Sequence, residues 1–153
     1  MPDTEHSMSI LLVDDSATDA ELCIDTLQQH KLANRLDWVK DGAEALEYLF
    51  AEGRYADRAN RPMPHLILLD LAMPKVNGFD VLRRIRSDQK TKAIPVVVMT
   101  SSQEDRDITE SYDLGVNSYV SKPVVFDEFA KTVAQLGLYW LLVNRVPPEL
   151  SQA

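Results

Sequence analysis

The sequence contains one cysteine, five glycines and no long apolar segment. The single thiol, that of Cys23, cannot form an internal disulfide or supply a cluster of thiolate metal ligands. No stretch approaches the roughly 18 apolar residues that span a bilayer, and residues 1–9 lack the apolar centre of a signal peptide. These features predict a soluble protein of a reducing compartment, the cytoplasm.

Cations are also scarce. The 16 Lys and Arg residues are outnumbered by 24 Asp and Glu residues, which gives a formal net charge of −8. Nucleic-acid binding needs clustered cations that neutralise phosphates, so this composition argues against it. The 153 residues, 45% of them hydrophobic, suit one globular domain. We expect a disordered tail over residues 1–8, a folded domain over 9–143 and a tail over 144–153, which is too short for an output domain.

Three short apolar runs stand at Ile10–Val13, Leu66–Leu69 and Val96–Met99. They lack polar–apolar alternation, which is typical of strands buried on both faces of a parallel sheet. A buried helix is the competing interpretation of each run, but a length of four residues favours strands. Two weaker strands are expected over Arg35–Lys40 and Asn117–Ser121.

Amphipathic helical patterns lie between these strands. Their apolar stripes are Ala20, Cys23, Ile24 and Leu27; Ala43, Leu46, Leu49 and Phe50; Val81, Leu82 and Ile85, with Arg83, Arg84 and Arg86 facing outward; Ile108, Tyr112 and Leu114; and Phe126, Phe129, Val133, Leu136 and Trp140. Thr18 or Asp19 is expected to cap the first helix. Five β/α repeats predict an α/β fold with a doubly wound, five-stranded parallel sheet, and the long segment 51–65 is expected to protrude.

Polar residues follow the ends of four of the predicted strands. Asp14 and Asp15 follow the first strand and Asp70 the third, while Thr100 follows the fourth and Lys122 the fifth. Because ligands bind beyond the carboxyl ends of parallel strands, we expect these side chains to form one site. Three neighbouring carboxylates repel, so the pattern indicates a hard divalent cation such as Mg²⁺. The alternative is that each acid merely caps a helix.

Four motifs occur in order along the chain. They are Val13-Asp14-Asp15-Ser16; Leu68-Leu69-Asp70-Leu71-Ala72-Met73-Pro74, followed by Gly78; Thr100-Ser101; and Ser121-Lys122-Pro123. Together they resemble the receiver domains of two-component response regulators, over roughly residues 9–140. The resemblance implies a flavodoxin-like (βα)5 fold and a phosphoacceptor that assists its own phosphorylation and dephosphorylation, rather than a conventional enzyme.

The same resemblance implies a role for each acid. Asp70 would accept a phosphoryl group from the phosphohistidine of a histidine kinase. Asp15 would bind Mg²⁺ directly and Asp14 through water, while Asp70 and the backbone carbonyl of Ala72 would complete the protein ligands. A carboxylate is a competent nucleophile for forming an aspartyl phosphate, which agrees with this division of roles.

The resemblance also implies a switch. Lys122 would contact the phosphoryl group, and Thr100 would hydrogen-bond it when the domain changes conformation. Tyr119 would then turn inward, against the alternative that it is an ordinary half-buried strand residue. Pro123 would follow a cis peptide bond that aims the lysine inward. Ala72 offers no amide to orient an attacking water, so we expect a long-lived phosphorylated state.

The segment Leu136–Val143 is apolar on every side, beyond the single stripe that a surface helix needs. We expect this surplus to form a homodimer interface that contains Tyr139, Trp140 and Leu142. The alternative is that Pro147-Pro148 and the tail fold back over it.

A narrower resemblance points to one group of regulators. Four features resemble those of the phytochrome-associated single-domain response regulators: the acidic first motif, the long charged insertion before the third strand, Ser118-Tyr119 in the fifth strand and Tyr139-Trp140 near the end. This resemblance implies a bacterial phytochrome as the kinase. It also implies dimerisation through the fourth helix, the fifth strand and the fifth helix.

Two other classes of function stay open on the residues alone. A magnesium phosphohydrolase could use Asp70 as its nucleophile, but such enzymes usually carry a second acid where this chain has Ala72. A flavodoxin-like cofactor binder would need a phosphate cradle after the first strand, where Asp14 and Asp15 would repel the phosphate.

We expect five further residues to have structural rather than functional roles. Cys23 lies on an apolar helical stripe and is expected to pack in the core. His6, His30 and His65 have no second ligand at metal-binding spacing, and Trp38 is expected in the core or at the sheet edge.

Overall fold

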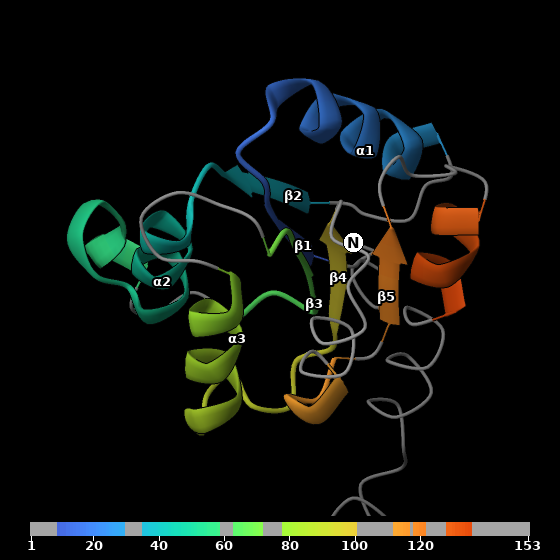
Figure 1. The fold of residues 1–153 in the computed structure, drawn as a ribbon. Helices are drawn as coiled ribbons and strands as arrows, with labels where there is room; N and C mark the ends of the chain where they lie inside the picture. Colours follow the sequence, from blue (N-terminus) through green and yellow to red (C-terminus); the bar gives the residue numbers. More distant parts are fainter. Residues whose placement is uncertain are drawn as a thin grey trace, which may run out of the picture.

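The computed structural model describes residues 9–29, 35–58, 63–71, 78–100, 112–116, 118–121 and 128–135. Within these ranges the chain alternates between strands and helices, as Figure 1 shows. The backbone alone is described at Thr100, Ser118 and Ser121. The predicted tails over 1–8 and 144–153 and the apolar segment 136–143 lie outside the described residues.

The strands form one parallel sheet. They are β1 (Ser9–Val13), β2 (Arg35–Val39), β3 (Leu66–Leu69), β4 (Val96–Thr100) and β5 (Ser118–Ser121). Their order across the sheet is β2-β1-β3-β4-β5, and every neighbouring pair is parallel. Strand β1 lies between β2 and β3, so Leu12 pairs with Trp38 in β2 and with Leu68 in β3. The predicted α/β fold with a five-stranded parallel sheet is confirmed, and its strand order is the flavodoxin-like one.

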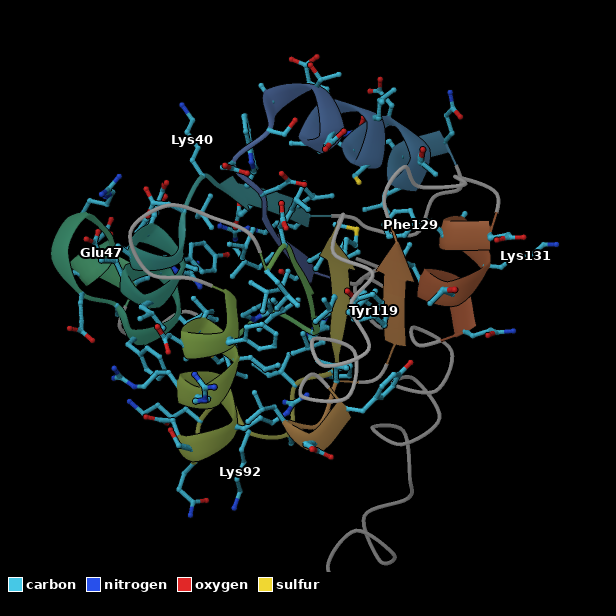
Figure 2. The ribbon with its side chains drawn as sticks, viewed as in Figure 1. Lys40, Glu47, Lys92, Tyr119, Phe129 and Lys131 are labelled. Atoms are coloured by element: carbon cyan, nitrogen blue, oxygen red, sulfur yellow. The ribbon has the colours of Figure 1, made fainter. Side chains whose placement is uncertain are left out.

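Helices cover both faces of the sheet. They are α1 (Ala17–Gln29), α2 (Gly42–Phe50), α3 (Gly78–Ser87), the 3-10 helix η2 (Gly53–Arg58) and a helical segment over 128–135. Figure 1 shows α1 and the 128–135 segment on one side of the sheet and α2 and α3 on the other. Phe129 and Val133 are buried, whereas Lys131 is exposed and points away from the sheet (Figure 2).

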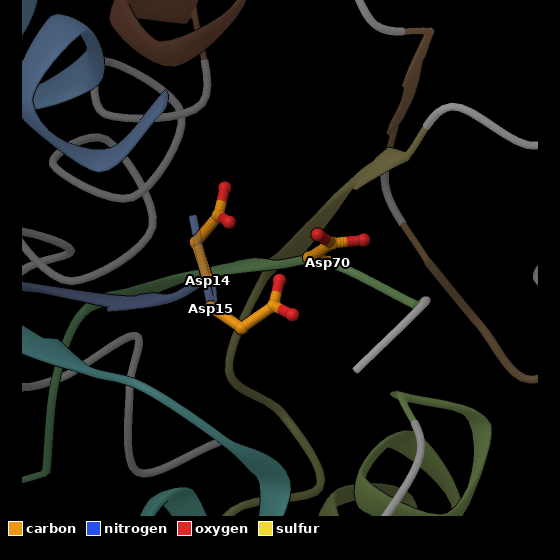
Figure 3. Close-up of side chains that lie close together, drawn as sticks. All are labelled: Asp14, Asp15 and Asp70. Atoms are coloured by element: carbon orange, nitrogen blue, oxygen red, sulfur yellow. The ribbon is translucent and has the colours of Figure 1, made fainter. Parts of the chain in front are cut away.

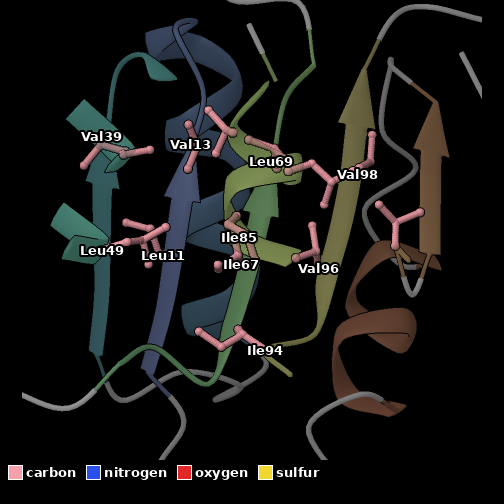
Figure 4. Close-up of a cluster of buried hydrophobic side chains, with 14 of the residues drawn as sticks. Leu11, Val13, Val39, Leu49, Ile67, Leu69, Ile85, Ile94, Val96 and Val98 are labelled. Carbon is pink, nitrogen blue, oxygen red and sulfur yellow. The ribbon is translucent and has the colours of Figure 1, made fainter. Parts of the chain in front are cut away.

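The two helical layers give two apolar cores. Leu11, Val13, Ile67, Leu69, Val96 and Val98 pack with residues of α2 and α3 (Figure 4). Ile10, Leu12, Leu66, Leu68, Val97 and Met99 pack with α1 and with the 128–135 segment. Successive strand side chains point to opposite faces, so a strand covered on both faces is apolar throughout. The interpretation of the three apolar runs as doubly buried strands is therefore confirmed, as is the core packing of Cys23.

The beginnings of two helices depend on side-chain caps. The Oγ of Ser16 accepts a hydrogen bond from the backbone N–H of Asp19 at 3.3 Å, so the prediction that Thr18 or Asp19 caps the first helix is wrong. Helix α2 begins after Asp41, whose carboxylate accepts from the N–H of Glu44 at 2.8 Å. The cap of α1 matters for function because the loop between β1 and α1 carries two of the candidate acids.

Residues 53–58, which follow α2, do not form a free loop. Its residues 53–58 form η2, and Arg58 is buried with its guanidinium carbon 3.6 Å from the ring centroid of Tyr48. The ring of Tyr55 lies edge-on to Tyr48 at 5.3 Å between centroids. Burial and a hydrogen bond to Asp37 raise the pKa of Tyr48, which keeps the phenol neutral. Arg58 and Tyr55 thus hold residues 53–58 against Tyr48 of α2, and the expected protrusion of the whole segment 51–65 stays a prediction because residues 59–62 lie outside the described residues.

Arg86 does not face outward as its helical pattern predicts. Its guanidinium donates hydrogen bonds to the backbone oxygens of Ile94 at 2.8 Å, Lys92 at 3.0 Å and Gly115 at 2.6 Å. Burial lowers the pKa of Arg86, and the three carbonyls accept four hydrogen bonds from the five N–H groups of its guanidinium. Arg86 thus joins α3 to the turns that precede β4 and β5.

Within the described part of the chain, no helix is long and apolar enough to cross a bilayer. The predicted fourth helix is described only around Tyr112, which is 52% exposed, and Leu114.

Candidate metal centre at the carboxyl edge of the sheet

Three carboxylates converge where β1 and β3 end. Asp14 and Asp15 follow β1, and Asp70 follows β3. Since Val13 pairs with Leu69 in the parallel register, the two strands end at the same level. One carboxylate oxygen from each residue lies within 4.8 Å of the others (Figure 3). The structure thus brings together three of the residues that the sequence pattern assigned to one site.

The three acids differ in burial. Asp14 is fully buried and Asp70 is 4% exposed, whereas Asp15 is open to solvent. Removing a charged carboxylate from water costs free energy unless hydrogen bonds or an opposite charge offset it. Repulsion among three ionised groups adds to that cost. The arrangement therefore suits a ligand that brings positive charge.

Backbone hydrogen bonds fix both acidic loops. The N–H of Asp70 donates to the carbonyl of Val13 at 2.9 Å, and the N–H of Asp14 donates to the carbonyl of Val39 at 3.2 Å. The Oδ1 of Asp14 accepts from the N–H of Ser16 at 2.9 Å. Because Ser16 itself caps α1, the alternative in which Asp14 or Asp15 serves as the N-cap is wrong.

Gly78 lets the start of α3 approach the loop after Asp70. Its N–H donates to the carbonyl of Leu71 at 2.9 Å. A Cβ at this position would lie 2.4 Å from the Cα of Leu71 and 2.6 Å from the backbone oxygen of Asp70. Any side chain would thus displace the backbone that carries the third carboxylate.

One residue near the site was missed by the sequence analysis. The indole Nε1 of Trp38, in β2, donates to the backbone carbonyl of Asp14 at 2.8 Å. A tryptophan in a strand is ordinarily a packing residue, and no local pattern shows a contact with a residue 24 positions away. His65 also makes a contact, since its Nδ1 accepts from the N–H of Ser9 at 3.0 Å, but at the other end of β1.

The other predicted site residues are only partly described. The strands β4 and β5 end at the same level, because Thr100 pairs with Ser121. Tyr119 pairs with Val98, is half-buried and packs against the core on the α2 and α3 side. Six predicted residues lie outside the described ranges: Ala72, Lys122, Pro123, Tyr139, Trp140 and Leu142.

A parallel sheet of this order with three acids at its carboxyl edge defines the class of the protein. The chain belongs to the response regulator receiver domain family, whose family model matches residues 10–134. Receiver domains are phosphoacceptor signalling domains that histidine kinases phosphorylate. This membership decides against the phosphohydrolase and cofactor-binding alternatives.

Individual relatives show which kinds of response regulator the chain is similar to. The chain is 39% identical over 145 residues to a probable methanogenesis regulatory protein, FilR2, of Methanothrix harundinacea, covering 95% of this chain and 91% of that protein. It is 38% identical over 138 residues to the response regulator Rcp1 of Synechocystis sp., covering 90% of this chain and 92% of Rcp1. Among solved structures, the bacteriophytochrome response regulator RtBRR matches with a TM-score of 0.78 and 48% identity, covering 93% of this chain and 85% of RtBRR. The chain is thus a receiver-type response regulator homologous to phytochrome-associated regulators.

The donor set fits a divalent metal ion. Oxygen ligands lie about 2.0–2.1 Å from Mg²⁺ and about 2.3–2.6 Å from Ca²⁺, so two of them are at most about 4.2 Å or about 5.2 Å apart. The three carboxylate oxygens lie within 4.8 Å of one another, which is the scale of one divalent cation site and lets Mg²⁺ bind with a small adjustment or with one carboxylate held through water. Rcp1 has also been solved in a Mn²⁺-bound form, with a TM-score of 0.74 to this chain.

Proposed function

We propose that the chain is a phosphorylation-gated signalling module in which Asp70 accepts a phosphoryl group in a Mg²⁺-dependent reaction. The observation that carries this proposal is the convergence of Asp14, Asp15 and Asp70 within 4.8 Å at the carboxyl edge of the sheet. Asp70 directly follows a strand that is buried on both faces, so the backbone that carries its carboxylate is held in place.

The transfer makes one bond and breaks one. A carboxylate oxygen of Asp70 attacks the phosphorus atom of the kinase phosphohistidine, and the P–N bond breaks as the imidazole leaves with the electron pair. Charge spreads over the equatorial phosphoryl oxygens during the transfer, so positioning and neutralisation supply most of the catalysis. Bound Mg²⁺ would supply positive charge at those oxygens.

The acids divide the metal-binding work. Asp15 is exposed, which supports a role as direct ligand with Asp70 and the backbone carbonyl of Ala72. Asp14 is buried and its Oδ1 already accepts from Ser16, which supports an indirect role through a water molecule. Mg²⁺ ordinarily keeps several waters and takes few protein carboxylates, in agreement with this division.

The response to phosphorylation involves β4 and β5. Lys122 contacts the phosphoryl group, its direction set by a cis bond before Pro123, and Thr100 hydrogen-bonds the group once it is attached. Tyr119 then moves inward. Its half-buried packing beside Val98 supports such a change, because a modest displacement would alter its contacts with the core. With Ala72 near the acceptor, the phosphorylated state is long-lived.

The partners follow from the relatives and the sequence. The relation to a bacteriophytochrome response regulator supports a bacterial phytochrome as the kinase. The receiver domain extends over residues 9–143 between tails at 1–8 and 144–153, and it signals in the cytoplasm as a homodimer. The dimer interface contains Tyr139, Trp140 and Leu142, whose apolar character supports burial against a second copy.

Intact-mass measurement after incubation with acetyl phosphate and Mg²⁺ tests the acceptor role. We expect the wild type to gain one phosphoryl group and Asp70→Asn to gain none. Asp25→Asn, which removes a carboxylate from the exposed face of α1, is the matched control and should behave as the wild type. Equal labelling of Asp70→Asn and the wild type would refute the proposal.

A further inference from the structure

The acidic site is contacted from a neighbouring strand by an aromatic side chain. Trp38, in β2, donates its indole N–H to the backbone carbonyl of Asp14 at 2.8 Å. The length is that of a good N–H···O hydrogen bond. Its acceptor belongs to a residue that is fully buried, so water cannot readily replace the indole as donor.

The indole supplies a donor where the strand ladder stops. The last backbone bond between β1 and β2 in this region runs from the N–H of Asp14 to the carbonyl of Val39. Beyond it the chain turns away, since Asp41 already caps α2 with an extended backbone. In a continued parallel ladder the next donor to the Asp14 carbonyl would be a backbone N–H of β2. Trp38 therefore extends the β1–β2 pairing by one hydrogen bond.

This contact bears on the direction of both acidic side chains. The carbonyl of Asp14 and the N–H of Asp15 belong to one planar peptide unit. Fixing the carbonyl thus fixes the plane from which Asp15 departs, although Asp15 itself is exposed. With its N–H bonded to Val39 and its Oδ1 bonded to Ser16, Asp14 is held at three atoms.

The indole is itself held in place. Trp38 is half-buried and packs with Leu36 against the core on the α1 side. The Nζ of Lys40 lies 5.6 Å from its ring centroid, within range of a cation–π interaction. The ring therefore has contacts on its core side and on its surface side, and these contacts hold its N–H in one direction.

We propose that Trp38 is a positioning residue for metal binding, which orients the Asp14–Asp15 peptide so that both carboxylates face Asp70. The inference rests on the proposed function and adds a residue from a strand that contributes no acid to the site. Partners of this kind, which hold metal ligands without touching the metal, commonly change metal affinity by tenfold or more when removed.

Two replacements at position 38 remove the hydrogen bond. Trp38→Phe keeps an aromatic ring, and benzothienylalanine at the same position keeps the full shape of indole with sulfur in place of the N–H. Leu36→Ala is the matched control, because Leu36 lies on the same strand and packs against the same core. The dissociation constant for Mg²⁺ alone is measured by calorimetry, and the urea midpoint of each variant is measured in EDTA.

We expect both replacements at position 38 to weaken Mg²⁺ binding about tenfold. Leu36→Ala should lower the urea midpoint but keep the dissociation constant within about twofold, since Leu36 pairs with Ile10, four residues before Asp14. Unchanged Mg²⁺ affinity in both position-38 proteins, with a wild type that binds Mg²⁺, would overturn the positioning role and leave the proposed function intact. A wild type that neither binds Mg²⁺ nor accepts a phosphoryl group would overturn both.

Discussion

Asp70→Asn is expected to make the metal-free protein more stable. The substitution keeps the shape of the side chain and removes one of three carboxylates whose oxygens lie within 4.8 Å of one another. Because Asp14 and Asp70 are both buried, water screens their repulsion less than it would at the surface. If the carboxylate of Asp70 served stability alone, removing its charge would not stabilise the protein.

The size of the effect follows from the geometry. At 4.8 Å and an effective dielectric constant of about 20, two unit charges repel by about 3.5 kcal/mol. Side-chain adjustment and the solvent exposure of Asp15 reduce that value. We therefore expect Asp70→Asn to raise the free energy of unfolding by about 1–3 kcal/mol in EDTA.

Added Mg²⁺ should narrow the difference in stability between the two proteins. A ligand that binds only the folded state at ten times its dissociation constant stabilises it by about 1.4 kcal/mol. The wild type should gain this amount, whereas Asp70→Asn should gain much less because it has lost a ligand. Urea unfolding with and without Mg²⁺ measures both quantities, and Asp25→Asn controls for the general loss of negative charge.

Two results would refute this reasoning. In EDTA, Asp70→Asn could prove less stable than both the wild type and Asp25→Asn, which would mean that the carboxylate makes a favourable contact worth more than the repulsion. Equal Mg²⁺ stabilisation of Asp70→Asn and the wild type would show that Asp70 is not a metal ligand.

Three further predictions concern other parts of the molecule. Gly78→Ala should lower the free energy of unfolding by about 1–3 kcal/mol in urea titrations, because its Cβ would overlap the backbone after Asp70. Burial lowers the pKa of His65, whose Nδ1 must stay unprotonated to accept from Ser9. The unfolded chain thus takes up the proton first, so stability measured by urea unfolding should fall as the pH drops below about 6.5, and His65→Gln should flatten that dependence. In sedimentation equilibrium the wild type should dimerise at micromolar concentration, whereas a Tyr139→Glu, Leu142→Glu double variant should remain a monomer.

The acidic edge of the sheet could be predicted because its determinants are local. The run Leu66–Leu69 identifies a doubly buried strand by composition alone, and Asp70 follows it directly. Topology then requires that the carboxyl ends of neighbouring parallel strands meet. Proximity of Asp14 and Asp15 to Asp70 follows from these two facts, before any contact is known.

Contacts between distant elements could not be predicted in this way. The bond from Trp38 to Asp14 and the bonds from Arg86 to the carbonyl of Gly115 join residues that no periodicity relates. Tryptophan in a strand ordinarily packs in the core, and arginine on a helix is ordinarily exposed. Here each side chain instead donates to a backbone carbonyl that the fold brings within reach. The prediction of the residue that caps α1 was wrong for a different reason. Ser16, Thr18 and Asp19 all favour the N-cap position, and the course of the chain after β1 selects among them.

The central claim is that Asp70 carries the phosphoryl group and that the neighbouring acids act through a metal ion. Reduction of the acyl phosphate with borohydride after phosphorylation, followed by peptide mass spectrometry, locates the modified residue directly. We expect modification at Asp70 alone, present with Mg²⁺ and absent with EDTA. Modification at Asp14 or Asp15, or labelling of Asp70 that EDTA leaves unchanged, would contradict it.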